Sequence, residues 1–159
     1  LHFAREHAGL ELRQRSEQSA VMPDQRSDAV VRRAQHRASA LERTHAADVE
    51  VLVGRGEQLH DELPPLPEGT ETRGVGSVAY RLALLASGQG NAALSGHGRA
   101  EWDVAAGIAL CRAAGLRASD IFGEAMPFNQ ADPYVRGLLV AEPGLHSRLA
   151  TFFRRLRRE

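Results

Sequence analysis

Hydrophobic positions follow different patterns in the first third of the chain and in the rest. Within residues 28–43, apolar side chains recur at helical spacing between arginines, which predicts an amphipathic helix; they are Val30, Val31, Ala34, Ala38 and Leu41. From residue 49 onward, short runs of β-branched and apolar residues alternate with longer helical patterns. This alternation is typical of an α/β domain in which helices cover a sheet.

The short runs predict strands at Val49–Val53, Thr70–Val75, Ala92–Ser95, Ser119–Ile121 and Leu138–Ala141. The longer patterns predict three helices. One is capped by Ser77 and runs to Ser87, one begins at Asp103 and runs to about Ala114, and one begins at Pro143. The apolar stripe of this last helix is Leu145, Leu149, Phe152, Phe153 and Leu156. Gly88 and Gly115 follow the first two helices and are expected to end them in the left-handed conformation.

The expected fold class is therefore α/β, with a layered α-β-α arrangement, and the chain is expected to divide at residue 48. Residues 1–48 form an Arg/Gln-rich segment that is partly helical or disordered, and residues 49–159 form the α/β domain. A length of 159 residues suits one domain with a sizeable core.

Composition narrows the function classes. The formal net charge is zero, so the molecule as a whole has no electrostatic bias toward nucleic acids or anionic membranes. No apolar run has the length of a membrane-spanning helix. The single cysteine, Cys111, excludes an intrachain disulfide and favours a reducing compartment, so a cytoplasmic protein with a buried, inert thiol is expected.

The clearest candidate chemistry lies at Glu101-Trp102-Asp103, where two carboxylates flank a tryptophan at a predicted helix start. A carboxylate at Asp103 could accept hydrogen bonds from free amides of the first helical turn. It could also face outward and bind a hard cation, beside a helix N-terminus that favours an anion such as phosphate. The residues alone leave both interpretations open. Glu101 is likewise either a substrate-facing carboxylate or a solvated loop charge.

Three motifs, in this order, carry a resemblance to a known family. They are Val-Gly-Ser-Val-Ala-Tyr at residues 75–80, Ala-Ser-Gly at 86–88 and Glu-Trp-Asp-Val-Ala-Ala-Gly at 101–107. Together they resemble the C-terminal half of the inositol monophosphatase family of magnesium-dependent phosphatases, most of all its bacterial 3′(2′),5′-bisphosphate nucleotidase branch. Val51–Glu57 resembles the family's Val-Ser-Arg-Ser-Glu segment. The resemblance covers residues 51–146 and not the first fifty residues.

The resemblance implies a role for each motif. Asp103 would bind a catalytic Mg²⁺, and Gly76, Ser77 and Glu101 would line the substrate side. The helices that begin at Ser77 and Asp103 would point both N-termini into one pocket, which favours phosphate.

Two packing expectations accompany these roles. Trp102 would pack under the loop before the helix and fix the direction of the carboxylate. The small residues Ala105, Ala106 and Gly107 would let this helix approach the sheet closely.

Most metal ligands of the family come from an upstream Glu and an Asp-Pro-Ile-Asp-Gly-Thr-like motif, and neither occurs in this sequence. One carboxylate does not satisfy a divalent ion that needs about six oxygen ligands. The isolated chain is therefore expected to be inactive and to lack catalytic residues of its own. It would be either a fragment whose missing half supplies the metal cluster, or a chain whose first fifty residues come from a shifted reading frame or a diverged insertion.

The function expected from the resemblance is Mg²⁺-dependent hydrolysis of a phosphomonoester, in a bisphosphate nucleotide or an inositol phosphate. The alternative is a non-catalytic remnant or subunit that binds a partner or an anion. A third interpretation, an Arg-rich nucleic-acid binder, rests on residues 28–43 and 148–159 and is disfavoured. A small phosphorylated substrate is the expected partner, a membrane is not, and a homodimer is left open.

Overall fold

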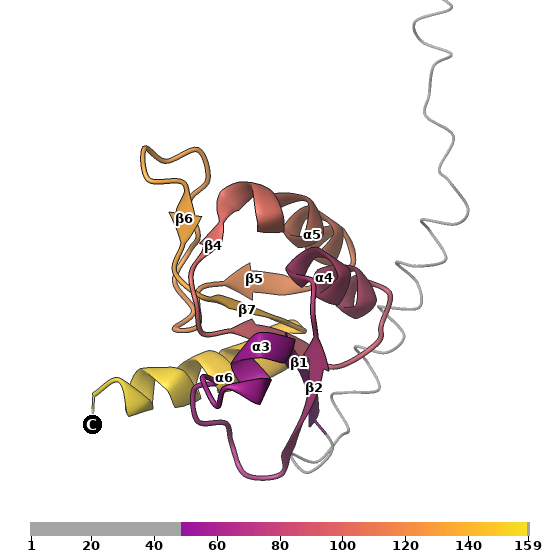
Figure 1. The fold of residues 1–159 in the computed structure, drawn as a ribbon, viewed down its shortest axis with the longest axis vertical. Helices are drawn as coiled ribbons and strands as arrows, with labels where there is room; N and C mark the ends of the chain where they lie inside the picture. The colour runs from indigo at the N-terminus through magenta and orange to yellow at the C-terminus, as the bar shows by residue number, and fades with distance from the viewer. Residues whose placement is uncertain (1–48, 159) are drawn as a thin grey trace, which may run out of the picture.

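The computed structural model describes residues 49–158, which form a five-stranded sheet covered by helices on both faces (Figure 1). The predicted helix at 28–43, and the segment 1–48 to which it belongs, lie outside the described residues. The layered α/β fold predicted from the sequence is confirmed.

The sheet has the strand order β2-β1-β3-β7-β5. Its strands are β1 (Val49–Gly54), β2 (Thr70–Val75), β3 (Ala92–Ser95), β5 (Arg117–Ser119) and β7 (Leu138–Ala141). The first three run parallel to one another, whereas β7 is antiparallel to both β3 and β5. A separate two-stranded ladder joins β4 (Arg99–Ala100) to β6 (Tyr134–Val135).

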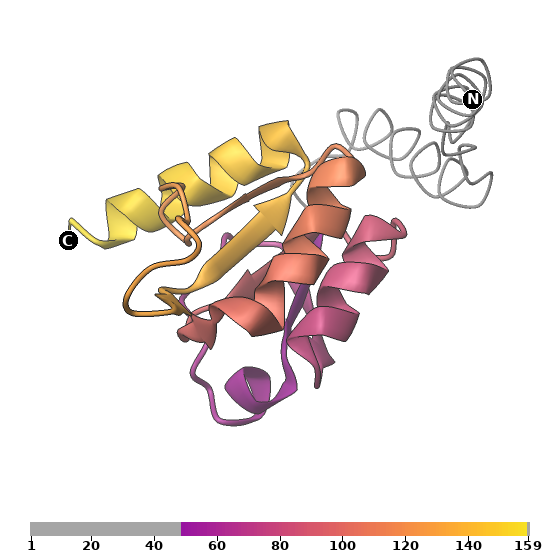
Figure 2. The same ribbon diagram turned by 90° about the horizontal axis from the view of Figure 1, so that it is seen from above.

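Helices α4 (Val78–Ala86) and α5 (Glu101–Ala113) cover one face of the sheet, and α6 (Pro143–Leu156) covers the other (Figures 1 and 2). Alternation along the strands produces the two cores, because successive side chains point to opposite faces. On β1, Leu52 belongs to the core under α4 and α5, while Val51 and Val53 belong to the core under α6.

Helices α4 and α5 pack closely at Gly107. A Cβ atom at residue 107 would lie 2.6 Å from Cδ1 and 2.8 Å from Cβ of Leu82 in α4. Ala105 and Ala106, by contrast, are exposed. The expectation that all three small residues bring α5 close to the sheet is therefore wrong. Of the three, Gly107 alone is buried, and its missing side chain lets Leu82 of α4 pack against α5.

Several boundaries differ from those predicted. Helix α5 begins at Glu101 rather than Asp103, with Ala100 at its N-cap, and β5 ends at Ser119 instead of starting there. A short helix, α3 (Arg55–Leu59), and the ladder of β4 and β6 were not predicted. The ladder joins segments more than 30 residues apart, so local periodicity does not indicate it, and α3 is a helix of five residues, too short for a periodic pattern.

The predicted helix ends are confirmed. Gly88 and Gly115 have φ angles of 82° and 80°, in the left-handed region that glycine adopts without a steric penalty. None of the helices among residues 49–158 combines the length and the hydrophobicity that crossing a membrane requires.

Candidate functional site at the carboxyl edge of the sheet

Strands β1, β2 and β3 run in the same direction and end at the same edge of the sheet, which is where ligands bind in open α/β sheets. The segments that follow them carry Gly54 and α3, Gly76 and Ser77, and the loop at residues 96–98. Helices α4 and α5 lie side by side, and both start at this edge, next to α3 (Figure 2). The structure therefore brings two of the predicted motifs to one edge.

Ser77 is the N-cap of α4, and its hydroxyl oxygen accepts a hydrogen bond from the Tyr80 amide at 3.3 Å. This confirms the predicted cap. Gly76, which precedes it, is exposed, and a Cβ atom there would meet nothing within 4 Å. The backbone before α4 is therefore accessible to a ligand from solvent.

Asp103 occupies the third position of α5, so the interpretation of this residue as the helix cap is wrong. Its side chain is exposed, and no residue in the described part of the chain donates a hydrogen bond to its carboxylate. A carboxylate in the first helical turn is favoured by the helix dipole.

Glu101, two residues earlier, has a different environment. It is 8% exposed, and its carboxylate accepts hydrogen bonds from the amides of Asn129, at 2.7 Å, and Gln130, at 3.3 Å. The interpretation as a solvated loop charge is therefore wrong. In this structure Glu101 ties the loop before β6 to the start of α5.

Trp102 does not pack under the preceding loop, which corrects the expectation from sequence. Its side chain is 68% exposed and lies against Tyr134 of β6, with ring centroids 6.5 Å apart and an interplanar angle of 64°. Tyr134 is itself 58% exposed. Two large aromatic rings are therefore accessible at the start of α5.

A buried ionic network at the same edge was not anticipated from the sequence. Glu57 of α3 is 4% exposed, and its carboxylate accepts hydrogen bonds from the Ser95 hydroxyl at 2.8 Å and the His97 amide at 3.1 Å. Two guanidinium groups lie near it, those of Arg81 at 3.7 Å and Arg99 at 3.6 Å. The network joins α3, α4, the end of β3 and the loop that leads to α5.

His97 also belongs to this network, because its Nδ1 atom lies 3.1 Å from Oε1 of Glu57. Half of the His97 side chain is accessible to solvent. The one sequence signal for Glu57 is the resemblance of residues 51–57 to a family segment. Its partners become neighbours only when the strands assemble.

Competing effects act on the charges of this network. Burial raises the pKa of Glu57, but the hydrogen bonds from Ser95 and His97 and the charges of Arg99 and Arg81 outweigh it, so this pKa lies below its ordinary value. Burial lowers the pKa of Arg81, although Glu57 opposes this effect. The carboxylate therefore stays ionised in the folded chain and compensates the buried guanidinium.

The described residues do not fit a magnesium ion by themselves. Within residues 49–158, no group of three or more His, Cys, Asp or Glu side chains is arranged to hold a metal. Asp103 offers one carboxylate, and the sequence His60-Asp61-Glu62 lies in an exposed segment. A hard divalent cation needs more oxygen ligands than this edge supplies.

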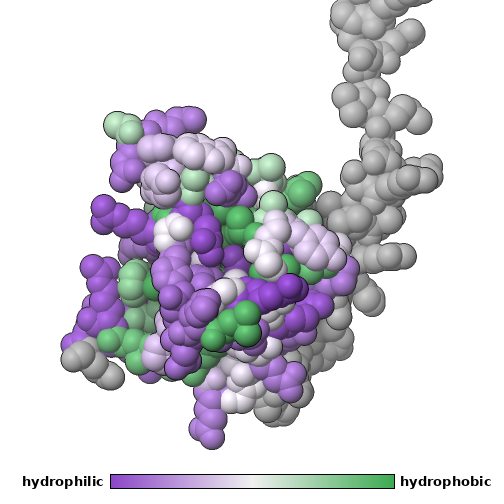
Figure 3. Space-filling model, in the orientation of Figure 1, coloured by the Kyte–Doolittle hydropathy of each residue, from purple (hydrophilic) through white to green (hydrophobic). Residues whose placement is uncertain are grey.

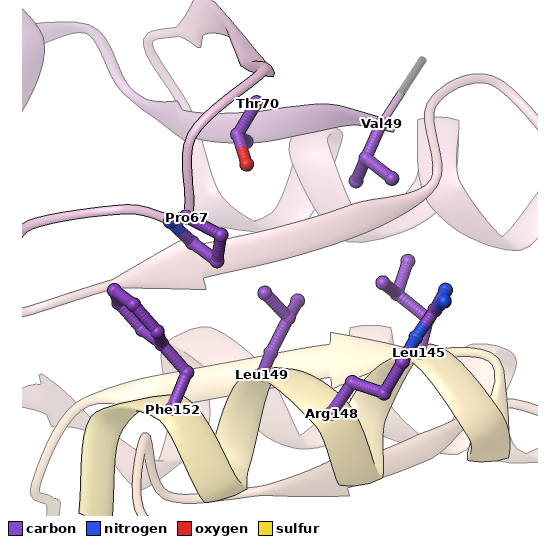
Figure 4. Close-up of a pocket in the computed structure, with 7 residues that line it drawn as sticks. All are labelled: Val49, Pro67, Thr70, Leu145, Arg148, Leu149 and Phe152. Carbon is purple, nitrogen blue, oxygen red and sulfur yellow. The ribbon is translucent and has the colours of Figure 1, made fainter. Parts of the chain in front are cut away.

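Two cavities lie near the edges of the sheet, and neither is lined by Gly76, Ser77 or Asp103. An apolar one lies between α6 and the starts of β1 and β2 (Figure 4); it is lined by Val49, Pro67, Thr70, Leu145, Arg148, Leu149 and Phe152. The other, of about 200 Å³, lies beside β6 and has Tyr134 in its wall. Hydrophobic side chains on the face seen in Figure 3 are scattered among polar ones.

Two buried reactive groups have structural explanations. Cys111 is fully buried, its thiol donates to the Leu82 carbonyl at 3.4 Å, and burial raises its pKa to about 12. The predicted inert thiol is confirmed. His146 of α6 is 1% exposed, with Nε2 2.8 Å from the Ser119 hydroxyl. Burial, aided by Arg117 and Arg154, lowers its pKa to about 4.

Comparison with known proteins agrees with this geometry. A model described as "Inositol monophosphatase family" matches residues 4–158, so the chain belongs to the inositol monophosphatase family. The match includes most of segment 1–48, where the sequence resemblance was not expected to extend. The division of the chain at residue 48 stays a prediction.

Two mycobacterial proteins, from Mycobacterium bovis and Mycobacterium tuberculosis, are each named 3′-phosphoadenosine 5′-phosphate phosphatase. Both are 36% identical to the chain over 66 residues, which are 42% of this chain and 25% of theirs. Inositol monophosphatase-II from Staphylococcus aureus has a similar fold, with a TM-score of 0.54 at 20% identity. That alignment covers 67% of this chain and 41% of the staphylococcal chain. The chain thus matches less than half the length of these relatives.

Proposed function

We propose that the chain supplies the carboxyl-edge part of a phosphomonoesterase site that depends on Mg²⁺. The observation that supports this most directly is the pair of helix starts at one edge of the sheet, with Ser77 at one and the exposed Asp103 at the other. Free amides at helix N-termini attract phosphate, and an adjacent carboxylate attracts the cation that accompanies it.

Each predicted site residue has a role in this proposal. Asp103 provides one carboxylate oxygen for the metal, and Gly76 and Ser77 present backbone amides to the substrate phosphate. Glu101 was predicted to bind substrate, but both of its oxygens accept backbone amides of the loop at 129–130. We therefore assign it an indirect role, in which it holds that loop against α5. The remaining metal ligands come from water or from residues outside 49–158.

The substrate class that we favour is a nucleoside bisphosphate, with inositol phosphates second. The support is the name of the two mycobacterial relatives, whose alignment covers a quarter of their length. The metal chemistry, when complete, would activate a water molecule for attack on phosphorus. The described residues of this chain bind and orient the phosphate.

The test is Mg²⁺-dependent release of inorganic phosphate from adenosine 3′,5′-bisphosphate by the full 159-residue chain, measured alone and after mixing with the N-terminal half of a family member that supplies the remaining metal ligands. Asp103→Asn should lower the rate about 100-fold, because it removes a charged ligand at the metal. Glu71→Gln is the matched control, since Glu71 is exposed near the start of β2, at the opposite edge. An equal effect of the two substitutions would contradict the role of Asp103.

A wild-type chain without activity, alone or mixed with the N-terminal half of a family member, would favour the alternative function. The chain would then be a non-catalytic subunit that binds an anion or a partner. Isothermal titration with inorganic phosphate distinguishes an anion-binding subunit from a partner-binding one, because only the anion-binding subunit predicts measurable phosphate binding.

A further inference from the structure

We propose that the cavity beside Tyr134 is a base subsite, which binds the purine of a nucleotide substrate by stacking. This inference rests on the proposed function for the position of the phosphate. It adds a specificity determinant that separates nucleotides from inositol phosphates.

The first argument is the position of Tyr134. Strand β6 pairs with β4 so that Tyr134 lies opposite Ala100, which is the N-cap of α5. The Glu101 amide also donates to the Pro133 carbonyl at 2.9 Å. Tyr134 is therefore held directly beside the start of α5, the helix whose first turn carries Asp103.

The second argument is the chemistry of the cavity. Its volume is about 200 Å³, and its wall combines apolar and aromatic side chains with a few polar ones. The lining residues are Asp120, Ala125, Met126, Pro127, Gln130, Tyr134, Val135 and Arg136. An apolar cleft with a few placed polar groups is typical of small-molecule sites. A flat heteroaromatic ring uses both kinds of surface, whereas an inositol ring, hydroxylated all round, has no aromatic face to stack.

The third argument is the exposure of the aromatic rings. Trp102 and Tyr134 contact each other, yet each is more than half exposed. Packing of the core therefore does not explain them. Base–aromatic stacking would bury this apolar surface and is a large contribution to binding for each base.

The fourth argument is that the cavity is held in shape. The carboxylate of Glu101 fixes the loop that contains Gln130, and Oδ1 of Asp120 accepts the amides of Phe122 and Glu124 on the other side. A preformed site loses less conformational entropy when the ligand binds. Glu101 thus links the base subsite to the phosphate side.

The experiment uses the full chain and three probes that separate the two parts of the ligand. Adenosine carries the base without phosphate, inositol 1-phosphate carries phosphate without the base, and adenosine 3′,5′-bisphosphate carries both. Trp102 is the only tryptophan, so its fluorescence reports binding near Tyr134 without any need for turnover. Calorimetry gives the affinities.

Tyr134→Ala should weaken both adenosine ligands about 10-fold and leave inositol 1-phosphate unchanged. Tyr134→Phe keeps the ring and should retain the affinity, whereas unchanged binding of inositol 1-phosphate by Tyr134→Ala excludes misfolding of that variant. Tyr80→Ala is the matched control, because Tyr80 is 59% exposed on α4 and does not line the cavity.

The base subsite is overturned if wild-type protein does not bind adenosine. It is also overturned if Tyr134→Ala leaves the nucleotide affinity unchanged, or lowers the affinities for nucleotide and inositol phosphate equally. Adenosine binding that depends on Tyr134, without phosphate release from any substrate, supports the subsite and contradicts the proposed function. If phosphate is released from the bisphosphate at a rate that does not change in Tyr134→Ala, the proposed function is supported and the base subsite is contradicted.

Discussion

On one face of the sheet, α4 and α5 lie side by side and begin where the parallel strands end. On the other face, α6 follows β7, which runs antiparallel to β3, and this helix therefore begins at the opposite edge (Figure 2). All four predicted site residues belong to the first face. Strand direction thus decides which helix starts can meet at one site, although all three helices bury an apolar side against the same sheet.

The two faces also differ in how their buried ionisable side chains are compensated. Beside α4, the buried Arg81 is compensated by Glu57, whereas under α6 the buried His146 is neutral at ordinary pH. The pair of Glu57 and Arg81 requires the desolvation of two charges, but the network to which it belongs joins four segments at the carboxyl edge of the sheet. The arrangement under α6 leaves Nδ1 of His146 without a hydrogen-bond partner among the described residues. The following predictions test this contrast, from the largest expected effect to the smallest.

Glu57→Ala should lower the free energy of unfolding by about 3–5 kcal/mol, because it leaves the Arg81 guanidinium buried without its counter-charge. Urea unfolding followed by circular dichroism measures the effect. The control is Glu62→Ala, an exposed carboxylate in the segment after α3, for which we expect less than about 0.5 kcal/mol. A loss below about 1 kcal/mol for Glu57→Ala would mean that the network does not hold this face together.

On the α6 face, stability should depend on pH through His146. The folded chain has a lowered pKa of about 4 at this residue against an ordinary value of 6.5, so the unfolded chain binds a proton that the folded chain does not. The contribution is complete above pH 6.5 and is lost as the pH falls toward 4, by up to about 3 kcal/mol.

Unfolding free energies measured between pH 7 and 4 test this, with His146→Gln as the comparison. The variant should be less stable at pH 7, but its stability should fall less steeply over this range. Parallel curves for the two proteins would show that His146 is not the group responsible.

Gly107→Val should cost about 2 kcal/mol, because the new Cβ atom would overlap the Leu82 side chain and push α4 and α5 apart. The same residue introduced by Ala109→Val, at an exposed position of α5, provides the control for helix propensity. If both substitutions have equal effects, the close approach of the two helices is not important for stability.

Ser77→Ala should have the smallest effect, about 1 kcal/mol, through loss of the cap on α4. Ser147→Ala on α6 is matched in chemistry but lies within a helix, where its hydroxyl donates to the Pro143 carbonyl. We expect almost no change there, since alanine is the better helix former. Thermal unfolding of the two variants separates the cap from a general serine effect.

The sequence predicted most of the fold, because local patterns carry it. Strands such as Thr70–Val75 and Leu138–Ala141 are recognisable as short apolar or β-branched runs, and helix ends are marked by Ser77, Gly88 and Gly115. The start of α5 was misplaced by two residues, since an alanine at the N-cap gives no side-chain signal.

The candidate site was predicted less completely. Family motifs indicated Gly76, Ser77, Glu101 and Asp103, and their roles stay proposals. No local pattern shows that the Glu101 carboxylate accepts hydrogen bonds from the loop at 129–130. Nor does a local pattern show that Trp102 faces solvent, or that Glu57 lies near arginines from two other elements. Each of these features results from contacts across 24 residues of sequence or more, apart from the exposure of Trp102.

What the sequence determined by itself is the set of elements and the family-like motifs, since hydrophobic periodicity and capping residues act over a few positions. Tertiary structure decided the direction in which each helix start points and the partner that each buried charge receives. Both depend on strand order and on the direction of β7. Glu101 is engaged because the loop at 129–130 packs against the start of α5, whereas Asp103, two residues later in the same motif, lies on an exposed side of that helix.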